Sequence, residues 1–330
     1  MTTNQLLAIA ASVLAGAAPL IFAALGETIS ERAGVINLSL DGTMLLAAMT
    51  GFAVALRTGS TLLGLLAAAL IGCLVALVLC WLSLSLGQSQ TAVGFVLALL
   101  ATDLSSFLGN PFVRVPGVAV AAAPAPFLRD IPVLGPLFFR HDPLIYASFL
   151  LIPALWFFLF RTRAGLVVRA LGERPEAVFA RGHNVIRLRY FYVLLGGAFV
   201  GIAGATYSLD IKQGWSYRHT AGIGWIALAI VIFGGWNPWR VALGCYLFGG
   251  LQTLASLMQS TVPQIPTQIF QVAPFALMIF VLAIVNSSGN PEVLQRVDRL
   301  PAGLRRPLRR VLGRVAAAPP AALGQPFVQP

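Results

Sequence analysis

Long apolar stretches recur along this 330-residue chain and decide what it can fold into. A helix needs about 20 mostly apolar residues to cross the hydrocarbon layer of a bilayer. Hydrophobic residues make up 58% of the composition and charged residues only 10%, whereas soluble domains carry about 25% charged residues. The sequence therefore predicts an all-α integral membrane protein with about nine transmembrane helices. We place them at residues 6–26, 35–57, 61–86, 88–109, 143–160, 190–209, 223–236, 238–258 and 269–286.

The basic residues are distributed unevenly between the two sides of these spans. Cytoplasmic loops carry an excess of Lys and Arg. If the loop 161–189 is cytoplasmic, 16 of the 22 Lys and Arg residues lie inside and six lie outside. This distribution predicts an outer N-terminus and a cytoplasmic C-terminus, provided that the number of crossings is odd. One re-entrant segment would reverse the side of the N-terminus.

Two parts of the chain are expected on this basis, a transmembrane domain at 1–290 and a basic cytoplasmic tail at 291–330. The arginines between 296 and 314 suit the anionic inner leaflet. The final stretch "AAAPPAALGQPFVQP" has too much proline and too little periodicity to fold alone, so the tail is expected to be partly disordered. The loop 110–142 is expected to form an ordered cap on the outer surface.

A second loop, "RTRAGLVVRALGERPEAVFARGHNVIRLRY", contains two short helical patterns. We expect one helix from Leu166 to Leu171, a break at Gly172, and a second helix that starts at Pro175 and ends at Gly182. Charge alone would make this an ordinary positive-inside loop. The pair of short helices, angled and rich in arginine, also suits a docking element.

The stretch "ALGERPEAVFARGHN" resembles the conserved cytoplasmic loop of permease subunits of ABC importers, in the family that serves branched-chain amino acids, simple sugars and nucleosides. The stretches "SERAGVINLSLDGTMLL", "QTAVGFVLALLATDLSSFL", "DIPVLGPLFF" and "AGIGWIALAIVIFGGWNPWRVALGCYLFG" resemble the same family and extend the likeness over most of residues 20–250. Their order and spacing are closest to nucleoside or simple-sugar permeases.

The resemblance implies a coupling helix that rests in a groove of a separate ATPase subunit. It also implies an extracytoplasmic solute-binding protein, a second permease subunit that is a sibling or a second copy, and a place in the bacterial inner (plasma) membrane. Nucleic acid is not an expected partner. The coupling residues would be Gly172, Glu173, Pro175, Glu176, Ala177, Ala180, Arg181 and Gly182.

Charges are concentrated in "GETISERAGVINLSLDG", between two apolar runs. A charged side chain at the bilayer centre costs about 2.5–3.5 kcal/mol on insertion scales, so it persists where protein or water receives it. We expect a broken or re-entrant segment here, with Asn37 and Asp41 on one helical face. These groups either clamp neighbouring helices together or contact the solute. The candidates for the translocation path are Asn37, Ser39, Asp41, Gln90, Thr91 and Asp103.

The predicted function is therefore that of a permease subunit of an ATP-driven importer that carries a nucleoside or a simple sugar by alternating access. The chain has no Gly-x-x-x-x-Gly-Lys-Ser/Thr motif, so ATP and Mg are expected on the partner ATPase and this chain is not expected to be an enzyme. No cofactor or metal site is expected in the chain itself. One alternative is a branched-chain amino acid ABC permease. Another is a proton-coupled secondary transporter that uses Asp41, Asp103 or Asp210.

Overall fold

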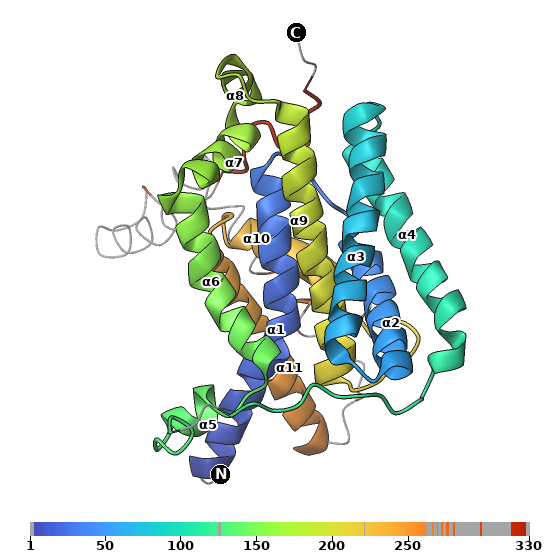
Figure 1. Cartoon of the computed structure of the whole chain (residues 1–330). Coiled ribbons are helices and arrows are strands. Elements are labelled where there is room, and N and C mark those ends of the chain that lie inside the picture. Colours follow the sequence, from blue (N-terminus) through green and yellow to red (C-terminus); the bar gives the residue numbers. More distant parts are fainter. Residues whose placement is uncertain are drawn as a thin grey trace.

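Seven long helices form a bundle in this computed structural model (Figure 1). The structure describes residues 3–124, 127–220, 222–261 and 318–327, with single positions between 262 and 317. Each of the seven helices is long and apolar enough to cross a membrane, which confirms the predicted all-α membrane class over the described residues. They are α1 (Thr3–Arg32), α2 (Leu40–Thr58), α3 (Thr61–Cys80), α4 (Gln90–Gly109), α6 (Pro143–Arg161), α9 (Val185–Thr206) and α11 (Pro238–Thr261).

Four shorter helices accompany the bundle: α5 (Leu134–Phe138), α7 (Arg163–Glu173), α8 (Pro175–Ala180) and α10 (Ile223–Phe233). The predicted span at 223–236 is wrong, because α10 has only 11 residues, about 17 Å at the helical rise, and a crossing needs about 30 Å. The other predicted span without a long helix, 269–286, lies outside the described residues apart from single positions.

The two ends of the bundle differ. α7 and α8 lie together at one end, which we call the α8 end, and the N-terminus lies at the other (Figure 1). Five long helices separate the N-terminus from α7. Because this number is odd, the N-terminus and α7 lie at opposite ends of the bundle. The assignment of the α8 end to the cytoplasm stays a prediction from the distribution of arginines.

Close helix contacts in the middle of the bundle depend on glycine. A Cβ atom on Gly72 in α3 would lie 2.0 Å from the backbone oxygen of Gly197 in α9, and a Cβ on Gly42 in α2 would lie 2.1 Å from the backbone oxygen of Ala98 in α4. Backbones that approach this closely exclude any larger residue. The glycines of α9 therefore allow close packing of the helices.

The chain leaves the helical conformation between α1 and α2. The backbone N–H of Asn37 donates to Oε1 of Glu27 at 3.0 Å, so residues 33–39 turn back alongside the last turns of α1. α2 consequently begins at Leu40, five residues after the predicted start. Asn37 lies before the helix, and its expected placement on one helical face with Asp41 is wrong.

The loop 113–142 lies across the end opposite α8 (Figure 1). Its first part runs beside residues 209–215, with a backbone bond from the N–H of Gly117 to the oxygen of Gln213 at 3.4 Å. This arrangement agrees with the predicted ordered cap for the residues that are described there. His219 is packed nearby, between Tyr207 and Trp215, and burial lowers the pKa of its imidazole.

Candidate functional site: the α8 end and the polar centre of the bundle

α7 and α8 follow from local signals in the sequence. The hydroxyl of Thr162 accepts the N–H of Gly165 at 2.9 Å and caps the start of α7. Pro175 occupies the first turn of α8, where its missing N–H has no cost. Gly182, with φ of +83°, ends the element. The predicted pair of short helices is present, and the second has the predicted start.

The first of the pair differs from the prediction. α7 begins at Arg163 and continues through Gly172 to Glu173, so Gly172 does not break it. A Cβ at Gly172 would lie 2.5 Å from the backbone oxygen of Arg32. This glycine therefore marks a close contact between α7 and the end of α1, a role that helix propensity alone does not reveal.

The predicted coupling residues divide into an anchor and an exposed surface. Pro175 and Gly172 are buried, and Val178 beside them joins the main hydrophobic core. The other six predicted residues are exposed: Glu173, Glu176, Ala177, Ala180, Arg181 and Gly182. A short helix that is held by its buried side and presents small and charged residues on the other can receive a partner protein.

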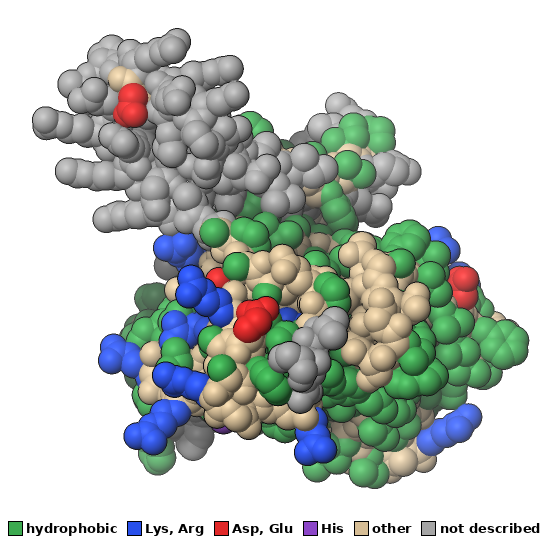
Figure 2. Space-filling model, turned by 90° about the horizontal axis from the view of Figure 1, so that it is seen from above, with side chains coloured by type: hydrophobic (Ala, Val, Ile, Leu, Met, Phe, Trp, Pro, Cys, Tyr) green, Lys and Arg blue, Asp and Glu red, His purple; other side chains and the backbone are tan. Residues whose placement is uncertain are grey.

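Lys and Arg side chains gather over one part of the α8 end, with few acidic side chains among them (Figure 2). The exposed arginines of the α6–α9 connection are Arg161, Arg163, Arg174, Arg181 and Arg187. Such a basic surface suits either an inner leaflet or an acidic partner surface.

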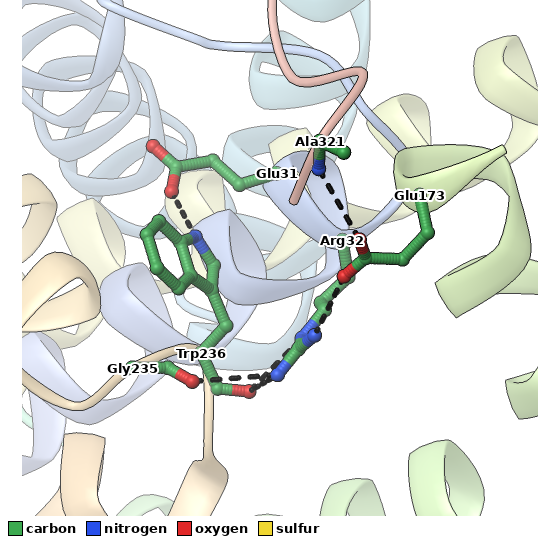
Figure 3. Close-up of polar contacts among 6 residues, drawn as sticks. All are labelled: Glu31, Arg32, Glu173, Gly235, Trp236 and Ala321. Atoms are coloured by element: carbon green, nitrogen blue, oxygen red, sulfur yellow. Dashed lines mark hydrogen bonds and ion pairs between the residues drawn. The ribbon is translucent and has the colours of Figure 1, made fainter. Parts of the chain in front are cut away.

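Polar contacts connect α7 with the interior of the bundle (Figure 3). Arg32, at the end of α1, pairs with Glu173 at 3.9 Å and donates to the backbone oxygens of Gly235 and Trp236 at 3.2–3.3 Å. The indole N–H of Trp236 donates to Glu31. These contacts join the end of α7, the end of α1 and the turn between α10 and α11.

Sequence reasoning missed two members of this connection. Only 3% of the surface of Trp236 is exposed, and its indole N–H bonds inside the bundle. Glu31 is likewise buried. A Trp and an acid 205 positions apart give no local pattern, so only the tertiary structure pairs them.

A buried polar cluster surrounds the segment that precedes α2. The side-chain oxygen of Asn37 accepts both the N–H and the hydroxyl of Ser39, the latter at 2.5 Å, and the Ser39 hydroxyl lies 3.2 Å from that of Thr43. Asn37 and Ser39 are almost completely buried. In this conformation they hold the chain rather than face an open passage.

Asp41 holds two helix starts together. Its Oδ1 atom accepts the N–H of Gly222 at 2.8 Å and the N–H of Gly224 at 3.1 Å. Gly222 precedes α10 and has no side chain with which to cap it, so Asp41 supplies that cap from the first turn of α2. A carboxylate at a helix N-terminus is also favoured by the helix dipole. Of the two roles left open by the sequence, this geometry is that of a clamp.

The three candidates on α4 have different surroundings. Gln90 is buried, and its Oε1 atom accepts the N–H of Ile36 at 2.9 Å, which ties α4 to the segment before α2. Thr91 and Asp103 are exposed. Both belong to a stripe of exposed pairs that follows α4 for its whole length: 91 and 92, 95 and 96, 99 and 100, 103 and 104, 107 and 108.

No group of three or more His, Cys, Asp or Glu side chains suited to a metal ion occurs within the part of the chain that the structure describes. The cysteines Cys73, Cys80 and Cys245 are free, and the last two are buried.

Known proteins resemble this chain over most of its length. The family model for the permease component of branched-chain amino acid transport systems matches residues 9–282. A putative glucose ABC transporter permease protein of Haloferax volcanii is 39% identical over 83% of both chains. A nucleoside ABC transporter permease protein of Lactococcus lactis subsp. cremoris is 35% identical over 85% of this chain and 93% of its own.

A guanosine ABC transporter permease protein of Bacillus subtilis is 36% identical over 85% of this chain and 92% of its own. No solved structure matches the chain significantly.

Proposed function

This chain belongs to the family of permease components of branched-chain amino acid transport systems, and we propose that it is the membrane subunit of an ATP-driven importer for a nucleoside or a simple sugar. The proposal rests mainly on the 35–39% identity to nucleoside and glucose ABC permeases, which extends over at least 83% of this chain and of each of these relatives. The chain is a transport subunit, and a separate ATPase that binds ATP and Mg supplies the energy.

The proposed coupling site is the exposed side of α8, with Glu176 and Ala177 at its centre. When the ATPase displaces α8, the displacement is transmitted to Arg32 through its ion pair with Glu173. From Arg32 it is transmitted to the turn after α10 through the hydrogen bonds to Gly235 and Trp236. α10 in turn begins at the Asp41 clamp. ATP drives alternating access only if its binding differs in free energy between the inward-open and outward-open states.

Asp103 supports a second permease subunit beside α4. The residue lies about 20 Å from the start of the span Gln90–Phe112 and about 14 Å from its end at 1.5 Å per residue, and it is exposed. A carboxylate at this depth is costly against lipid. α4 also forms one edge of the bundle (Figure 1). We therefore place the second subunit, and the translocation path between the two, on the exposed stripe of α4.

A cysteine cross-link tests this interface. Leu99→Cys, one turn from Asp103 on the exposed stripe, is expected to cross-link to the second permease subunit in the purified complex, because the stripe is covered there. Leu150→Cys on α6, at the opposite edge of the bundle and 70% exposed, is the matched control and is expected to remain uncross-linked. If Leu150→Cys cross-linked to the second subunit and Leu99→Cys did not, the interface would lie at α6, which would contradict its proposed position beside Asp103.

The solute-binding protein is proposed to dock on the cap 110–142 and the neighbouring loop 210–222. The proposed location of the assembly is the bacterial inner membrane, with the α8 end and the C-terminus in the cytoplasm. The family description also names branched-chain amino acids, so leucine is the alternative solute within the same mechanism.

Uptake into proteoliposomes that hold the permease with its ATPase and binding protein tests the proposed solute class. Labelled solutes are purine nucleosides, pyrimidine nucleosides, glucose, pentoses and leucine. We expect ATP-dependent accumulation of a nucleoside or a sugar. Accumulation of leucine alone would contradict the proposed solute while retaining the importer.

A further inference from the structure

A segment near the C-terminus packs against the α8 end. Residues 318–327 form a short run of turns there, beside α7 and α9 (Figure 1). This segment lies beyond residues 9–282, the part that matches the family model. Its described contacts are largely with other elements of the fold.

Two backbone hydrogen bonds attach the segment at separate places. The N–H of Ala322 donates to the backbone oxygen of Gly172 in α7 at 2.7 Å, and the N–H of Gly324 donates to the oxygen of Gly34 at 3.1 Å. Gly34 belongs to the chain between α1 and α2. The segment is thus bonded both to the last turn before α8 and to the connection that leads into the Asp41 clamp.

Arg189 depends on the same segment. Its side chain is among the largest that are fully buried, at 1% exposure. Nη1 donates to the backbone oxygen of Gln325 at 3.1 Å and Nη2 donates to the oxygen of Leu171 at 3.4 Å. A buried guanidinium without acceptors is costly. Withdrawal of the segment would remove the acceptor of Nη1. Docking of the segment and burial of the Arg189 side chain therefore stabilise each other.

Two side-chain contacts complete the attachment. The N–H of Ala321 donates to Oε2 of Glu173 at 3.3 Å, and Oε1 of the same carboxylate pairs with Arg32 (Figure 3). The ring of Phe327 lies 6.1 Å from that of Phe179 in α8, measured between centroids. The segment therefore contacts α7, α8, α9 and the connection after α1.

We propose that residues 318–327 act as a coupling strap, which carries displacement of α8 to the connection between α1 and α2. The inference rests on the proposed ATPase docking at α8, and it assigns a transmission role to a segment outside the shared family region. Because the strap contacts α7 and α8 and is also bonded to the connection between α1 and α2, displacement of α8 moves the start of α2. Without it, α7 still reaches the end of α1 through the close packing of Gly172 on Arg32 and through the pairing of Arg32 with Glu173 at 3.9 Å, but it has no hydrogen bond to Gly34.

The strap is tested in the full complex with the variant A322P/G324V. Proline removes the donor to Gly172, and valine is strained at the φ of +75° that Gly324 adopts. Loss of two hydrogen bonds shifts the docked fraction by about tenfold or more. We expect the ATPase to copurify and hydrolyse ATP, while the solute transported per ATP falls severalfold. Gln325→Ala, which removes an exposed side chain whose one hydrogen bond in the described part of the chain goes to Ala321, is the matched control.

A peptide with the sequence of residues 316–330, added on the α8 side, is expected to restore coupling to the variant. The same peptide with Gly324→Val is expected to be inactive. An unchanged ratio of solute to ATP in A322P/G324V would overturn the strap. If the double variant Glu176→Lys with Ala177→Trp kept full uptake and ATPase binding, the proposed ATPase docking at α8, on which the strap rests, would fail instead.

Hydrogen exchange in the unmodified complex gives a second test that does not depend on folding of a variant. The amides of Ala322 and Gly324 are expected to exchange slowly without ATP, and their rates are expected to change together with those of residues 175–182 when ATP binds. Fast exchange at both amides in every state, or no joint change, would overturn the proposal.

Discussion

The double variant Glu176→Lys with Ala177→Trp is expected to abolish uptake and association with the ATPase, while the permease still inserts into the membrane. Both side chains are exposed on α8, whereas Pro175 and Val178 anchor the helix in the core. The substitutions therefore alter the docking surface and leave the packing of α8 intact. A reversed charge and a bulky ring at a desolvated contact each cost about 2 kcal/mol of binding free energy, or about a thousandfold in affinity together. Uptake and copurification of the ATPase are the measurements.

The control for this variant is Gln88→Lys. Gln88 is exposed near the C-terminal end of α3, and neighbouring Ser85 bonds to Tyr190 of α9, so the control adds charge to the same end of the bundle away from α8. It is expected to retain uptake. If the double variant transported normally and still copurified with the ATPase, the docking assignment would be wrong.

Asp41→Ala is expected to destabilise the protein by about 2–5 kcal/mol and to abolish uptake, because two backbone N–H groups at the start of α10, one buried and one partly buried, lose their only described acceptor. Thermal unfolding in detergent measures the first effect and ATP-driven uptake measures the second. Loss of these two hydrogen bonds would also separate the start of α2 from the start of α10.

Asp41→Asn is the matched control for the clamp. Both hydrogen bonds end on Oδ1, and an amide oxygen can accept them, so the loss of stability is expected to be smaller, about 1–2 kcal/mol. Equal destabilisation by Ala and Asn would contradict the clamp. A stable Asn variant without uptake would show that the negative charge has a further role in transport.

The long helices were predictable because each is a continuous apolar run, and seven of the nine predicted spans correspond to helices of sufficient length. The length of the helix α10 was overestimated for a physical reason. Its hydrophobic sequence continues into the turn around Trp236, which packs inside the bundle against Glu31. Hydropathy measures how apolar a stretch is, and it does not distinguish burial in lipid from burial in protein.

The surface of α8 was partly predictable, since Pro175 and Gly182 mark its ends by local backbone preference. The polar centre was less so. Gln90, Asn37 and Asp41 were identified as polar groups in an apolar setting, but each of them accepts at least one backbone N–H group, some of them far along the chain. Backbone groups carry no sequence signature, so the sequence alone left open whether these side chains clamp the fold or meet the solute.

We expect this permease to move solute only when a separate ATPase acts on its α8 end. The decisive measurement is solute uptake into proteoliposomes that contain the permease and the binding protein, with and without the ATPase subunit. Uphill accumulation of solute is expected only when the ATPase and Mg-ATP are both present, with no requirement for a proton gradient. Accumulation by the permease without the ATPase, driven by a proton gradient, would contradict this expectation and would favour the secondary transporter.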